Sequence, residues 1–136
     1  MKILLLADAN SPHTRKWVAA LKEQNIELAL VSLTPVNTPE AKSFYSGVLC
    51  RSFDYTSAAG KALSKLMYFR AVFAIRAMIR RFGPDIVHAH YASSYGLLGA
   101  LASPRRYCIS AWGSDVYVFP KSGAVYKALL KYAFSK

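Results

Sequence analysis

The segment GPDIVHAHYASSYGLLGAL carries two histidines one residue apart, and the later segment CISAWGSDVY carries a Trp-Gly-Ser-Asp sequence. Imidazoles donate or accept hydrogen bonds and move protons, and a carboxylate such as that of Asp115 binds hydroxyl groups or acts as a base. A third polar segment, DANSPH near the amino terminus, contributes Asn10, Ser11 and His13. These residue types fit a binding site for a hydroxyl-rich or anionic ligand, provided that the fold brings the three segments together.

Each of these segments contains or follows the end of a predicted β-strand. Apolar runs predict five strands, at Lys2–Ala7, Ile26–Leu33, Val48–Phe53, Asp85–Tyr91 and Arg106–Ala111. Helical spacing and capping residues predict helices at Pro12–Gln24, at Ser57–Phe82, from Ser93 or Ser94 to Ala102, and from about Gly123 onward, with a looser connection over 34–47. Strands that alternate with helices imply a parallel sheet with right-handed crossovers, so residues 1–136 are expected to form one doubly wound, Rossmann-like α/β domain. The commonest strand order for such a unit is 3-2-1-4-5.

In an open α/β sheet the ligand lies outside the carboxyl ends of the strands. Asn10, Ser11 and His13 stand there, at the start of a predicted helix whose free backbone N–H groups suit a phosphate or another anion. The same residues also fit a plain helix cap followed by a surface side chain. Because this loop lacks the sequence Gly-x-Gly-x-x-Gly, a nicotinamide or flavin oxidoreductase is disfavoured.

The alternation of a strand places His88 and His90 on one face and Tyr91 on the other. His90 is nearer the ligand end, whereas His88, one pleat deeper, fits a hydrogen-bonded structural residue. Two histidines on one face could also bind zinc, but a third ligand at a fitting spacing is not evident and the nearest acidic candidate is Asp115. We therefore expect no metal.

The Trp-Gly-Ser-Asp sequence marks the end of the fifth predicted strand. Gly113 permits an unusual backbone conformation there, and the Ser114 and Asp115 side chains can bind hydroxyl groups or cap the local backbone. A plain turn remains the alternative. Gly96 and Gly99, at helical spacing after the fourth strand, favour a close approach of that helix to the sheet.

The composition narrows the class of partner. Eighteen Lys and Arg against seven Asp and Glu give a net charge of +11, which favours anionic partners. No known nucleic-acid-binding motif is recognisable, so no specific nucleic acid is expected. Cys50 and Cys108 follow no disulfide or metal spacing, which favours reduced thiols in the cytoplasm.

A basic patch is predicted on the helix over 57–82. Lys61, Lys65, Arg76 and Arg80 fall within an arc of about 100° when that helix is projected down its axis. Such a patch could hold the domain reversibly on an anionic membrane surface. The alternative is a helix packed on the sheet whose cations reach out to water.

Three segments in register resemble the amino-terminal domain of family 4 glycosyltransferases, which are retaining enzymes of the GT-B fold. These segments are ANSPHTRKWVAALKEQNIELALVS, PDIVHAHYASSYGLLGAL and SAWGSDVY. The resemblance implies transfer of a sugar from a nucleotide-sugar donor to a glycan or lipid-linked acceptor in cell-surface polysaccharide biosynthesis, at the cytoplasmic face of the membrane and without a metal or cofactor. It also implies that residues 1–136 form the acceptor-binding half, that the donor-binding half lies outside them, and that they are inactive alone.

The resemblance further implies which residues line the site. The expected substrate-binding residues are Asn10, Ser11, His13, His90, Tyr91, Trp112, Gly113 and Ser114, with Asp115 as the candidate catalytic carboxylate. Trp112 stands where many relatives carry a histidine, and an indole can stack on a sugar but cannot take a proton. The catalytic group therefore stays open, and a non-catalytic α/β ligand-binding domain is the alternative function.

Overall fold

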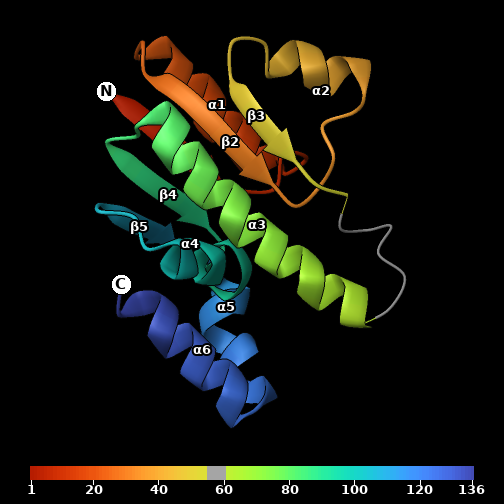
Figure 1. Ribbon diagram of the computed structural model, residues 1–136, viewed down its shortest axis with the longest axis vertical. Coiled ribbons are helices and arrows are strands. Elements are labelled where there is room, and N and C mark those ends of the chain that lie inside the picture. Colours follow the sequence, from red (N-terminus) through yellow and green to blue (C-terminus); the bar gives the residue numbers. More distant parts are fainter. Residues whose placement is uncertain (55–60) are drawn as a thin grey trace.

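A computed structural model describes residues 1–54 and 61–136, with side chains described for 1–54 and 68–136. Its centre is a five-stranded parallel sheet with the strand order β3-β2-β1-β4-β5, as Figure 1 shows. The strands are β1 (Lys2–Leu6), β2 (Glu27–Ser32), β3 (Leu49–Ser52), β4 (Ile86–His90) and β5 (Tyr107–Ser110). The predicted doubly wound α/β fold is confirmed, and the strand order is the one most common for such a unit.

Helices connect the strands and extend the chain beyond the sheet. They are α1 (Pro12–Glu23), α2 (Pro39–Phe44), α3 (Lys61–Phe82), the π-helical segment η1 (Ala92–Gly96), α4 (Leu97–Ala102), α5 (Gly113–Tyr117), the 3-10 segment η2 (Phe119–Ser122) and α6 (Ala124–Phe134). The predicted start of α3 at Ser57 lies outside the described residues.

Two of these helices, α2 and α5, were not predicted, and local hydrogen bonds explain both. Thr38 caps α2 through its side chain, which accepts a hydrogen bond from the Ala41 N–H, and Pro39 supplies the first helical residue. In α5, the Asp115 carboxylate accepts a hydrogen bond from the Trp112 N–H, which helps to begin the helix. The helix thus starts within the Trp-Gly-Ser-Asp sequence, for which a plain turn was the alternative. Each helix is too short for apolar periodicity to reveal it.

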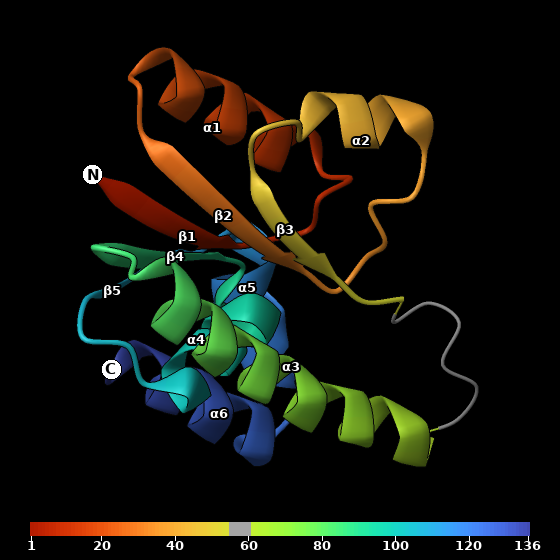
Figure 2. The same cartoon turned by 45° about the horizontal axis from the view of Figure 1, so that its top comes forward.

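The sheet is covered on both faces, so its strands are apolar throughout. Figure 2 shows α1 and α2 on one face and α3 with α4 on the other. Leu4 and Val31 point into the α3 side, where Ile75 and Leu98 meet them, while Leu5 points into the α1 side. The histidines of β4 share the face of Leu5, because their neighbours Val87 and Ala89 belong to the α3 side.

The packing role expected for Gly96 and Gly99 is confirmed. A methyl group at Gly96 would lie 3.1 Å from the Tyr91 carbonyl oxygen and 3.4 Å from Cδ1 of Ile109 in β5, which is a tight contact. A methyl group at Gly99 would lie 2.6 Å from two carbons of the Tyr107 ring, which is closer than van der Waals contact allows. Both glycines therefore let α4 lie directly against β5.

Helix α6 buries only part of its apolar surface. Leu130 and Ala133 are buried, whereas Val125, Leu129 and Phe134 are exposed. The physical reason is its place in the fold, because α6 contacts α4 and η1 (Figure 1) and has one helical layer between it and the sheet. A helix in such an outer position buries a single narrow stripe.

A candidate ligand site at the carboxyl ends of the strands

The three predicted segments come together at the carboxyl ends of β1, β4 and β5. The His13 and Trp112 rings lie 4.4 Å apart between centroids, and the Tyr91 ring lies 6.1 Å from that of Trp112. His90 lies behind them, 6.4 Å from Trp112. One aromatic cluster thus joins the first turn of α1, the end of β4 and the segment after β5: His13, His90, Tyr91 and Trp112.

The backbone at Tyr91 has an unusual conformation, with φ 73° and ψ 109°. Bulky residues rarely adopt a positive φ, and such strain persists where the surrounding structure imposes it, commonly at functional sites. The π-helical segment η1 follows directly, and its Gly96 N–H donates to the Tyr91 carbonyl at 2.7 Å. This geometry leaves the Tyr91 ring 40% exposed at the end of β4.

Asp115 holds the loops after β4 and β5 together. Its Oδ2 accepts hydrogen bonds from the N–H groups of Ala92 (2.9 Å) and Trp112 (3.1 Å). Its Oδ1 accepts from the Ser93 N–H (3.2 Å) and from the Ser93 hydroxyl. The side chain is 1% exposed, and these four bonds fill the acceptor positions of a carboxylate. The arrangement suits positioning of Tyr91 and Trp112 better than proton transfer to a ligand.

Trp17 covers both histidines of β4. Its ring lies 5.0 Å from His88 and 5.7 Å from His90, and its side chain is 41% exposed. His88 Nε2 shares a hydrogen bond with the Ser110 hydroxyl at 2.8 Å, as expected for a structural residue. His90 is only 2% exposed, and neither of its ring nitrogens has a hydrogen-bond partner within the described part of the chain.

Burial sets the charge state of these histidines. It lowers the pKa of His90 to about 4, with the neighbouring His88 and His13 adding to the effect, and it lowers the pKa of His88 as well. His90 is therefore neutral at pH 7, with one N–H donor and one bare acceptor nitrogen. The Trp112 indole N–H is also buried without a partner among the residues seen here. These atoms could bind a water or a ligand hydroxyl.

An open cavity of ≈ 580 Å³ lies in front of the aromatic cluster. Its lining consists of Asp8, Asn10, Ser11, Pro12, His13, Tyr91, Ser94 and Tyr95. Four predicted site residues, Asn10, Ser11, His13 and Tyr91, therefore share one cavity, which we call the strand-end cavity. Trp112 and His90 lie behind it through ring contacts, and the exposed Gly113 and Ser114 do not line it.

The strand-end cavity includes four residues that were not predicted as site residues: Asp8, Pro12, Ser94 and Tyr95. Asp8 comes two residues after the end of β1, a position that the strand-end rule could have singled out. Ser94 and Tyr95 lie three and four residues after Tyr91, a spacing that places side chains on one side of a helical turn. Trp17 was also missed, since it lies among apolar residues at helical spacing.

The anion site expected at the start of α1 has a modest set of donors. Ser11 is the N-cap without a side-chain hydrogen bond, and Pro12 removes one backbone N–H from the first turn. Among the described residues, no three His, Cys, Asp or Glu side chains gather in a way that could hold a metal ion.

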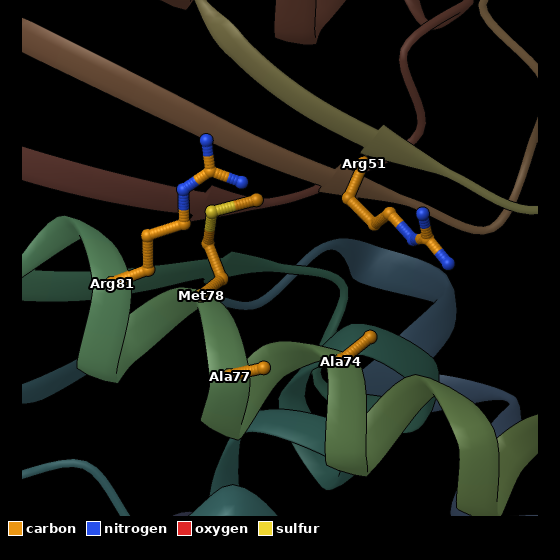
Figure 3. Close-up of a pocket in the computed structure, with 5 residues that line it drawn as sticks. All are labelled: Arg51, Ala74, Ala77, Met78 and Arg81. Carbon is orange, nitrogen blue, oxygen red and sulfur yellow. The ribbon is translucent and has the colours of Figure 1, made fainter.

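A second cavity, of ≈ 230 Å³, lies between β3 and α3. Its lining residues are Arg51, Ala74, Ala77, Met78 and Arg81. Figure 3 shows Met78 and Arg81 extending from α3 toward the strands, and Arg51 extending from β3. Of the predicted basic patch, Arg76 donates to the Leu101 carbonyl at 2.8 Å and Arg80 is exposed. The side chains of Lys61 and Lys65 lie outside the described residues. In the described part of the chain, no helix has both the length and the apolar character that crossing a bilayer requires.

Comparison with protein families gives one match. The family model described as "Glycosyl transferase 4-like" matches residues 2–136, which is nearly the whole chain. No curated protein and no solved structure matches the chain.

Proposed function

The chain belongs to the glycosyl transferase 4-like family, and we propose on that basis that it forms the acceptor-binding half of a retaining glycosyltransferase. The donor would be a nucleotide sugar with a hexosyl group, held by a second domain. The acceptor would be a glycan or a lipid-linked sugar in cell-surface polysaccharide biosynthesis at the cytoplasmic face of the membrane. The observation that carries this proposal is the meeting of three loops in one aromatic cluster beside the strand-end cavity.

The residues of the site suit recognition of a sugar. The exposed ring of Tyr91 can stack on the apolar face of a pyranose, with Trp112 packed behind it. Asn10, Ser11 and His13 offer amide, hydroxyl and imidazole groups to the sugar hydroxyls. We assign Asp115 a positioning role, because its four hydrogen bonds hold the backbones on which Tyr91 and Trp112 stand.

The proposed reaction forms a bond from an acceptor hydroxyl oxygen to the anomeric carbon of the donor sugar, while the bond from that carbon to the nucleotide phosphate breaks. The proton of the acceptor hydroxyl goes to a phosphate oxygen of the leaving group, so no protein base is needed. The site would contribute by orienting the acceptor. Orientation of the reactants can lower an activation barrier by several kcal/mol, roughly 7–11 at most.

We expect Tyr91→Ala to lower kcat/KM for glycosyl transfer by more than about tenfold, which is 1.4 kcal/mol of transition-state stabilisation. The measurement is transfer by the intact gene product from labelled nucleotide sugars, with the anomeric configuration of the product read by NMR. Tyr126→Ala is the matched control, because Tyr126 is similarly exposed (44%) but lies on α6.

Equal effects of the two substitutions would contradict the assignment of the site. No transfer from any nucleotide sugar, with a ligand still bound in the strand-end cavity, would favour a non-catalytic ligand-binding domain. An inverted product would contradict the retaining mechanism. We also propose that residues 1–136 alone give no turnover, and multiple turnovers by that polypeptide would contradict this.

We further propose that the outer face of α3 rests on an anionic membrane surface. Phe69 and Phe73 are exposed on this face, and the sequence of the helix contains no acidic residue. Arginine and lysine near an anionic leaflet contribute about 1 kcal/mol each. Changing Lys61, Lys65, Arg76 and Arg80 to Gln is expected to abolish co-sedimentation with anionic vesicles at physiological salt.

A control variant with the same net charge as the α3 variant separates binding through this patch from the general attraction of a basic protein to anionic vesicles. It changes four exposed lysines on or beside α6 to Gln, namely Lys121, Lys127, Lys131 and Lys136. We expect this variant to co-sediment nearly as well as the wild type. Equal loss in both variants, or equal binding to neutral vesicles, would leave α3 as a structural helix only.

A further inference from the structure

The charge of the strand-end cavity is opposite to that of the chain. The sequence has eighteen Lys and Arg and a net charge of +11, yet neither residue type occurs in the lining of this cavity. The lining does contain the carboxylate of Asp8. Building on the proposed function, we infer that this cavity selects an uncharged glycosyl unit of the acceptor and discriminates against acidic sugars and sugar phosphates, with Asp8 as the specificity-determining residue.

Hydrogen bonds fix the orientation of the Asp8 carboxylate. Its Oδ1 accepts from the Asn10 N–H at 2.8 Å and from the Thr34 hydroxyl. Within the described part of the chain, no hydrogen bond to Oδ2 is found, and Asp8 is only partly buried. One oxygen is therefore held in place while the other can accept a hydrogen bond from a ligand hydroxyl.

The rest of the lining complements a neutral sugar. The partly exposed ring of Tyr91 gives the same cavity an apolar wall, and Asn10 and Ser94 add uncharged polar groups. A sugar ring has hydroxyl groups at its edge and an apolar C–H face, so it matches a carboxylate and an aromatic ring together. The cavity volume of ≈ 580 Å³ lies within the range of about 300–1,000 Å³ found for small-molecule sites.

An acidic ligand would meet the like charge of Asp8 here, with no Lys or Arg in the lining beside it. Arg51 and Arg81 border the separate cavity between β3 and α3 (Figure 3), and Arg76 and Arg80 lie on α3. Arg15 and Lys16 stand on α1 outside the lining, and charges separated by more than about 8–10 Å of solvent are largely screened at physiological salt. Like charges placed close together are a means of rejecting the wrong ligand.

The test compares glycosides with their uronates, which carry a charged carboxylate at C6 in place of a neutral hydroxymethyl group. Methyl glucoside and methyl glucuronide, and the corresponding galacto and manno pairs, would be titrated into the protein at physiological salt. Backbone NMR signals of Asn10, Tyr91 and Ser94 would report binding. We expect the neutral member of at least one pair to bind about tenfold or more tightly than its uronate, since 1.4 kcal/mol of repulsion suffices for that ratio.

Two variants of equal net charge then show whether Asp8 causes the preference for the neutral ligand. Asp8→Asn removes the charge but keeps a side-chain oxygen for the Asn10 N–H. We expect this variant to bind the neutral glycoside and its uronate with affinities that differ by less than about threefold. Asp85→Asn removes a carboxylate at the opposite end of β4, where it accepts from the Lys2 N–H at 2.7 Å, and we expect the ratio to stay unchanged.

The outcomes separate this inference from the proposed function. A uronate that binds as tightly as its neutral partner, with the same signals shifting, would overturn the selectivity but leave acceptor binding in place. Equal effects of Asp8→Asn and Asp85→Asn would mean that overall charge sets the preference. If no glycoside of any pair shifts these signals, the acceptor-binding function itself fails. The comparison of ligands on the wild type needs no variant to fold.

Discussion

Replacing Asp115 by alanine is expected to lower the free energy of unfolding by about 3–5 kcal/mol. The buried carboxylate accepts four hydrogen bonds, from three N–H groups and the Ser93 hydroxyl, and alanine would leave all four donors without this acceptor. A net hydrogen bond to a charged group contributes roughly 1.5–3 kcal/mol, and an unsatisfied buried donor costs about as much. Urea unfolding followed by circular dichroism measures the change.

Asp85→Ala is the control for loss of a carboxylate. Asp85 is exposed and accepts one hydrogen bond, from the Lys2 N–H, so we expect a loss below about 1 kcal/mol. If Asp115→Ala unfolds like the wild type while glycosyl transfer falls by orders of magnitude, Asp115 acts on the substrate. That result would favour the catalytic role predicted from the sequence over the positioning role proposed from the structure.

The case of Asp115 shows what a sequence pattern leaves out. A carboxylate after a strand end can face a ligand or its own backbone, and the residue types are the same in both cases. The choice depends on the N–H groups of Ala92 and Ser93, which precede Asp115 by 23 and 22 residues. Only the pairing of β4 with β5 brings those groups to it.

The fold was predictable because its signals are long and repeated. Buried parallel strands are continuous apolar runs, and Gly83-Pro84 and Pro104 interrupt the helical segments between them. The short helices α2 and α5 were not predicted because single hydrogen bonds, accepted by the side chains of Thr38 and Asp115, help to begin them. Periodicity reveals the apolar residues of α6 but says nothing about what covers them, so their exposure could not be read from the sequence.

The site was predictable only in its outline. The strand-end rule located the loops that carry Asn10, His13 and Tyr91, and the structure brings these together. Trp17 was not predicted as a site residue because it shares helical spacing with core residues, although its ring lies over His88 and His90. Such contacts between helix and strand depend on the angle at which α1 crosses the sheet, which the sequence pattern does not give.

The buried histidines lead to the second large expected effect, a loss of stability in acid. Burial holds the pKa of His90 at about 4 in the folded chain, against 6.5 for an ordinary histidine in the unfolded chain. Between these values the unfolded chain binds a proton that folded His90 does not, so the free energy of unfolding rises with pH. The contribution is therefore fully present above about pH 6.5 and is lost as the pH falls toward 4. It amounts to about 2–3 kcal/mol.

Urea unfolding between pH 4 and 7.5, compared for the wild type and His90→Gln, isolates this contribution. Glutamine keeps a donor and an acceptor but does not titrate, so the variant should lose less stability in acid by about 2 kcal/mol, a factor of roughly 30 in the unfolding equilibrium. Some acid sensitivity should remain, because burial lowers the pKa of His88 in the same direction. Parallel stability curves for the two proteins would mean that His90 is hydrated or hydrogen-bonded in solution. A buried water between the unpaired His90 and Trp112 nitrogens would then occupy the place proposed here for a ligand hydroxyl.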